Sequence, residues 1–107
     1  MNVETNSKIL TTLTREKAFY FFTSIGNYTG MNALSLKEFV EKIGEVSVKS
    51  LEFHLCRGDF EKWVSDVLQD NDLASEMRKL QKLNLTGDDL RSQLSLVASR
   101  RLRNPTV

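Results

Sequence analysis

The sequence has little cysteine, little proline and no long apolar run. The single cysteine, Cys56, cannot form an internal disulfide, and the single proline, Pro105, stands near the end, so that no proline interrupts a helix. The longest apolar run, at residues 18–22, has five residues, against roughly 18 for a membrane span. Together with the lack of a signal-peptide pattern, these absences predict a cytoplasmic chain with no membrane contact.

The composition also lacks a strong charge of either sign. The 107 residues are 40% apolar and 27% charged, with a formal net charge of +1. These values are typical of one globular domain, and they provide no overall field that attracts nucleic acid or membrane. We expect a flexible N-terminal arm at residues 1–13, a single helical domain at residues 14–103 and a tail at residues 104–107.

Apolar residues recur at helical spacing in several segments. Phe60, Trp63 and Val64 share one face after Asp59, which can cap that helix. Ser35 and Glu38 form a capping box before another apolar stripe. Short polar breaks separate these segments. The pattern predicts an all-α fold, a compact bundle of five or six short helices.

Two segments fit either a helix or a strand. Residues 18–25 are short and aromatic, which suits a buried strand, but Thr14 and Gly26 can begin and end a helix. Residues 50–56 alternate as a strand would, whereas Ser47 and Gly58 again favour a helix. We favour a helix for both, and a tight turn or loop at residues 26–30.

His54, Cys56 and Asp59 are the strongest candidates for chemistry. A zinc site usually needs four ligands, and the chain holds no second cysteine or histidine. On a helix, residues two apart point in different directions, so His54 and Cys56 do not form a nucleophilic pair. We expect Cys56 to be buried and His54 to bond a backbone carbonyl or Asp59. No metal, cofactor or catalytic residue is predicted, and an enzyme is not expected.

The order His54, Arg57, Gly58 is similar to that of histidine phosphotransfer domains. Those domains are helical bundles in which an exposed histidine is followed by a basic residue and a glycine. This sequence has arginine where lysine is usual, and its glycine is placed to end the helix. The simpler interpretation is a helix terminus at which Arg57 meets the helix dipole.

The last seventeen residues are basic, with four arginines and no acid. A basic tail can bind phosphate, but no aromatic residue lies between the arginines as a single-strand platform requires. Cations are also favoured at a helix C-terminus, and that explanation ranks first. The possible nucleic-acid contacts are Arg91, Arg100, Arg101 and Arg103.

Three segments, residues 19–30, 35–39 and 50–63, together resemble a family of small archaeal proteins of unknown function with more distant bacterial relatives. The most specific string is His-Leu-x-Arg-Gly-Asp-Phe-Glu-x-Trp, which begins at His54. The resemblance runs from about Lys17 to Arg103. It implies an archaeal, intracellular domain with no established catalytic residues, and an aromatic residue in relatives where this chain has Cys56.

The sequence therefore predicts a non-enzymatic protein-interaction or accessory module of a larger assembly. The first alternative is a nucleic-acid-associated subunit of replication, repair or transcription machinery that uses the basic C-terminus. The second is phosphotransfer at His54. Self-association is left open. The expected contact surface comprises Asn27, Tyr28, Thr29, His54, Arg57 and Asp59.

Overall fold

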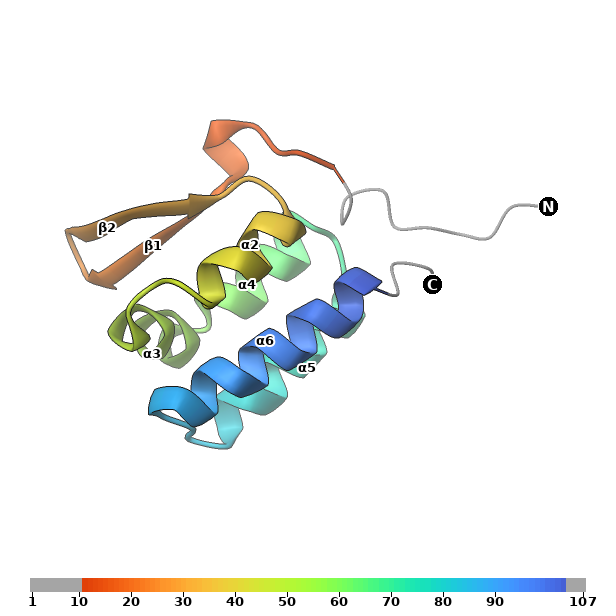
Figure 1. The fold of residues 1–107 in the computed structure, drawn as a ribbon. Helices are drawn as coiled ribbons and strands as arrows, with labels where there is room; N and C mark the ends of the chain where they lie inside the picture. The colour runs from red at the N-terminus through yellow and green to blue at the C-terminus, as the bar shows by residue number, and fades with distance from the viewer. Residues whose placement is uncertain (1–10, 104–107) are drawn as a thin grey trace.

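The computed structural model describes residues 11–103. A short 3-10 helix, η1, is followed by two strands and five α-helices (Figure 1). The elements are η1 (Arg15–Lys17), β1 (Phe19–Ser24), β2 (Asn27–Ala33), α2 (Leu36–Ile43), α3 (Val48–Arg57), α4 (Asp59–Asp66), α5 (Asn71–Lys82) and α6 (Gly87–Arg103).

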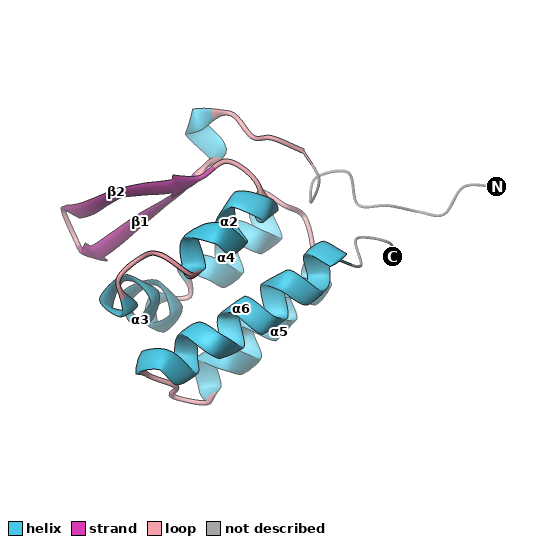
Figure 2. Ribbon diagram, viewed as in Figure 1, coloured by secondary structure: helices cyan, strands magenta, loops and turns pink. Residues whose placement is uncertain are grey.

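The prediction of an all-α fold is wrong, because residues 19–33 form an antiparallel hairpin of β1 and β2 (Figure 2). The helix expected between Thr14 and Gly26 is instead η1 and β1. The alternation of buried and exposed side chains along residues 19–21 explains why this segment is a strand. Phe19 and Phe21 point into the core, while Tyr20 between them is 36% exposed. In a strand, Phe19 and Phe21 share one face and Tyr20 lies on the other. In a helix, residues two apart such as Phe19 and Phe21 point in different directions.

Glycines shape the hairpin and explain why it resembled a loop. Ile25 and Gly26 form its two-residue connection, and Gly26 has a left-handed φ of 83°. Gly30 lies inside β2 with φ 87°, where the pairing shifts between Tyr20↔Asn32 and Phe22↔Tyr28. Such a shift is a bulge, a position that glycine suits. The loop expected at residues 26–30 is therefore the turn and the first part of β2.

The predicted helix signals are largely confirmed. The Ser35 hydroxyl accepts a hydrogen bond from the Glu38 N–H at 3.1 Å, and the Glu38 carboxylate accepts one from the Leu34 N–H at 2.9 Å. Ser47 caps α3 in the same way through the Lys49 N–H. Residues 50–56 are helical, as expected.

One hydrophobic core joins the hairpin to the helices. The hairpin lies on the opposite side of α2 and α4 from α5 and α6 (Figure 1). Aromatic rings fill the space between the hairpin and the helices, with Phe19 and Phe39 at a centroid distance of 5.7 Å and Phe39 and Trp63 at 5.1 Å. The Trp63 indole N–H also donates to the Lys17 carbonyl at 2.8 Å. The hairpin is thus part of the main core.

The predicted tail at residues 104–107 and most of the predicted arm at residues 1–13 lie outside the described residues. Within the arm, the Leu13 N–H donates to the Leu34 carbonyl at 2.6 Å. No helix in residues 11–103 is long and apolar enough to cross a membrane.

Candidate interaction groove

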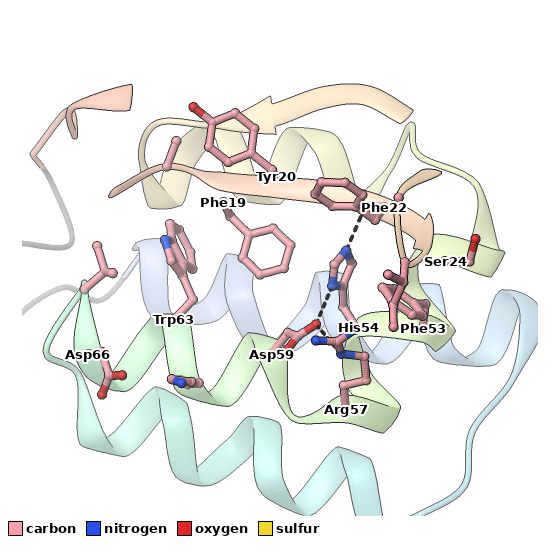
Figure 3. A pocket seen from close by; sticks show the side chains of 15 residues that line it. Phe19, Tyr20, Phe22, Ser24, Phe53, His54, Arg57, Asp59, Trp63 and Asp66 are labelled. Atoms are coloured by element: carbon pink, nitrogen blue, oxygen red, sulfur yellow. Dashed lines mark hydrogen bonds and ion pairs between the residues drawn. The ribbon is translucent and has the colours of Figure 1, made fainter. Parts of the chain in front are cut away.

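A groove of about 600 Å³ runs between β1 and the two helices α3 and α4 (Figure 3). Its walls are largely apolar, and they include the rings of Phe19, Phe22 and Trp63. At the turn of the hairpin, Ile25 lines the same groove and is 84% exposed. A hollow of this size and character is typical of binding sites.

His54 lines this groove and joins α3 to β1. It is only 4% exposed. Its Nε2 accepts a hydrogen bond from the backbone N–H of Phe22 at 2.8 Å, and its Nδ1 lies 2.8 Å from Oδ2 of Asp59 (Figure 3). Because Nε2 accepts, the proton of the neutral ring is on Nδ1, which donates to the carboxylate.

Burial lowers the pKa of His54 below its ordinary value, although the hydrogen bond and the charge of Asp59 oppose that shift. A proton added at Nε2 would face the Phe22 N–H and remove its acceptor. The neutral ring is therefore the form that fits the fold. A buried Nε2 already bonded to the backbone also gives a phosphoryl group no access, so the geometry gives phosphotransfer at His54 no support.

Of the two partners that the sequence suggests for His54, a backbone carbonyl or Asp59, the structure shows Asp59. The prediction that Gly58 ends α3 is confirmed. Gly58 has a left-handed φ of 79°. Asp59 makes no capping bond and is the first residue of α4, so the prediction that it caps this helix is wrong. Its carboxylate instead binds His54 and Arg57, whose Nε lies at 3.3 Å. Arg57 in turn stacks over the ring of Phe53 at 4.9 Å.

The other predicted contact residues, Asn27, Tyr28 and Thr29, form hydrogen bonds within the hairpin and do not line the groove. Asn27 donates to the Ser24 hydroxyl at 2.7 Å. Thr29 donates to the Phe21 carbonyl at 2.7 Å. Tyr28 is exposed and packs edge-on against Tyr20. The structure therefore brings His54, Arg57 and Asp59 together at the groove. Asn27, Tyr28 and Thr29 instead contribute to the geometry of the hairpin.

Two of the four arginines proposed to contact nucleic acid bind other parts of the domain. Arg91 donates to the carbonyls of Ile43 and Val46, both at 2.8 Å. Arg101 pairs with Asp70, which is 3% exposed, at 2.6 Å. Arg100 borders a hollow that acidic residues also line, and Arg103 is exposed.

Cys56 is exposed, so the expectation that it is buried is wrong. The side-chain amide of Gln81 donates a hydrogen bond to the backbone carbonyl of Cys56 at 3.0 Å. Within residues 11–103, no three His, Cys, Asp or Glu side chains are grouped as metal ligands.

Sequence reasoning missed most of the groove walls. The predicted helix at residues 18–25 places Tyr20, Phe22 and Ile25 in one element and does not identify them as lining a groove. Alternation of exposure along a strand is the signal that could have separated them, but five consecutive apolar residues conceal it.

The fold and groove define a small, mainly helical domain with one β-hairpin, which together with two helices forms an apolar groove. The chain belongs to a family of unknown function, DUF5752, whose model matches residues 2–99. This match confirms the uncharacterised domain inferred from the three sequence segments. Comparison with curated proteins and with solved structures gave no match.

Proposed function

We propose that the domain is a non-enzymatic protein-interaction module of a larger intracellular assembly, and that its partner docks in the groove between β1 and α3–α4. The observation that supports this is the groove itself, which has apolar walls and an exposed Ile25 at its end. Exposed apolar surface of this kind marks contact sites on proteins.

The groove has no arrangement that suggests catalysis. The one histidine is buried with both ring nitrogens hydrogen-bonded inside the domain. Its neighbours Asp59 and Arg57 neutralise each other. General acid–base chemistry needs a titratable group within reach of a substrate, and His54 does not meet that condition.

Nucleic-acid association is the alternative, and the arginines of α6 give it less support than their number suggests. Arg91 and Arg101 are engaged in contacts that hold α6 to the rest of the domain. A phosphate would have to compete with the buried Asp70 for Arg101.

We also infer an archaeal origin and a cytoplasmic location. The origin rests on the resemblance of residues 19–30, 35–39 and 50–63 to small archaeal proteins. The location is consistent with an exposed, unpaired cysteine, since such thiols are typical of reducing compartments.

The test is a pull-down from the source organism's lysate with the full chain, with and without nuclease. Lys62 is exposed and lines the groove, so Lys62→Trp fills the groove without replacing a core side chain. Lys49→Trp, at an exposed position of α3 outside the groove, is the matched control. Both variants are checked for unchanged circular dichroism.

We expect a stoichiometric protein partner that survives nuclease, is kept by Lys49→Trp and is lost with Lys62→Trp. Equal capture by both variants would disprove docking in the groove. Loss of every partner on nuclease treatment would favour the nucleic-acid alternative.

A further inference from the structure

The groove follows the edge of β1 that faces away from β2. Within residues 11–103 the sheet has two strands, and β2 pairs with one edge of β1. Figure 3 shows β2 on one side of β1 and the groove residues Trp63, His54 and Asp59 on the other. An unprotected strand edge presents a row of backbone donors and acceptors.

The direction of these backbone groups follows from two hydrogen bonds. The Phe21 carbonyl accepts from Thr29 on β2, and the Phe22 N–H donates to His54 on α3. Backbone groups of successive residues in a strand point to opposite edges. The N–H and C=O of Tyr20 and the C=O of Phe22 therefore face the groove, while His54 already occupies the Phe22 N–H.

The chemistry of the groove favours an extended chain over a helix. A helix satisfies its own backbone groups, so it would cover the Tyr20 N–H and C=O without giving them partners, which is unfavourable. An extended segment provides a matching acceptor and donor from one residue. The charged residues that line the groove balance, with Arg57 and Lys62 against Asp59 and Asp66.

We propose that the groove binds an extended segment of a partner protein, which adds to β1 as a third strand. One residue of that segment exchanges both backbone hydrogen bonds with Tyr20, and neutral, apolar side chains on alternate residues pack against Phe19, Trp63 and Val67. His54 prevents further pairing at the Phe22 N–H and so fixes the register. This binding mode depends on the proposed function, because it assumes a protein partner.

The probe is a displayed library of random 12-residue peptides, selected on the full chain and counter-selected on Lys62→Trp. Enriched peptides are synthesised and titrated by fluorescence anisotropy. Each backbone nitrogen of the best peptide is then methylated in turn, which removes one donor without changing the side chains. A strand should lose about tenfold or more in affinity at the nitrogen that bonds Tyr20, and little at its neighbours.

A variant of the domain provides the second measurement. Tyr20→Pro removes the N–H that faces the groove, and proline is tolerated where an edge N–H points away from the sheet. It should weaken peptide binding about tenfold more than Tyr20→Ala, which removes the side chain but keeps the N–H. Because the methylation series changes only the peptide, it decides the question even where Tyr20→Pro does not fold.

Peptides that need the groove but tolerate methylation at every nitrogen would overturn strand addition and leave the proposed function standing. Failure to enrich any peptide that depends on the groove would also overturn this inference, whereas the lysate experiment judges the proposed function separately. Sedimentation could also show a dimer that Lys62→Trp disrupts. That result would identify the occupant of the groove as a second copy of the chain and would overturn the inference of a partner's extended segment.

Discussion

His54 is the residue on which the groove's geometry depends most, since its ring joins β1, α3 and the first residue of α4. Burial lowers its pKa in the folded state below the unfolded value of 6.5. Below pH 6.5 the unfolded chain therefore binds more protons at this site than the folded chain, and falling pH must destabilise the fold.

We expect the free energy of unfolding contributed by His54 to be fully present above pH 6.5. It should fall as the pH drops from 6.5 towards the lowered folded pKa, by at most about 1.4 kcal/mol per pH unit. Urea titrations of the wild type and His54→Gln between pH 5 and 8 measure it, because the titrations of carboxylates that do not contact His54 cancel in the difference. A difference that does not change with pH would contradict the neutral, buried ring.

Arg101 and Asp70 form a buried ion pair, with side chains 14% and 2% exposed. Asp70 also caps α5 by accepting from the Leu73 N–H at 3.2 Å. Removing the guanidinium leaves a buried carboxylate without its cation. Arg101→Gln should therefore lower the free energy of unfolding by about 3 kcal/mol.

The matched control is Arg103→Gln on the exposed end of the same helix, where we expect a change within about 0.5 kcal/mol. Urea denaturation of the two variants makes the comparison. Equal effects would show that Arg101 has no structural role, and would return it to the nucleic-acid candidates.

At the scale of elements, the hairpin depends on a left-handed residue inside β2. Gly30 has φ 87°, and a Cβ added there would meet nothing within 4 Å. Any loss in Gly30→Ala is thus purely conformational, and we expect about 1 kcal/mol by urea denaturation. Gly30→Asn should cost less, since asparagine tolerates positive φ better than alanine.

Gly44→Ala is the control for that series. Gly44 ends α2 with φ −75°, which alanine adopts without strain, so we expect no loss of stability there. A comparable loss at both glycines would mean that the bulge in β2 does not need a left-handed residue.

At the scale of the whole molecule, the hairpin and the helices share one core and should unfold together. Trp63 stands between them, 5.5 Å from the ring of Phe19 and 5.1 Å from that of Phe39. Its fluorescence reports on this contact, while the circular dichroism at 222 nm is dominated by the helices. We expect the two signals to give the same urea midpoint. An earlier midpoint for fluorescence would show that the hairpin detaches first.

Local signals explain which helices could be predicted. Capping by Ser35 and Ser47 and termination by Gly58 involve residues within five positions of each other, and all three are found as expected. The spacing of Phe60, Trp63 and Val64 likewise predicted the buried face of α4. The hairpin was missed because β2, with a glycine in its middle and few apolar residues, has a weak strand pattern. A strand also needs a partner that local sequence does not identify.

The sequence by itself determined the caps of Ser35 and Ser47, the end of α3 at Gly58 and the buried face of α4, because each depends on neighbours in the chain. The tertiary structure alone decided that residues 19–24 form a strand and that one of its edges borders a groove. It also decided that Nε2 of His54 accepts from Phe22, 32 residues away, and that Trp63 reaches Lys17, 46 residues away. Such contacts arise from packing between distant segments, which spacing along the chain does not encode.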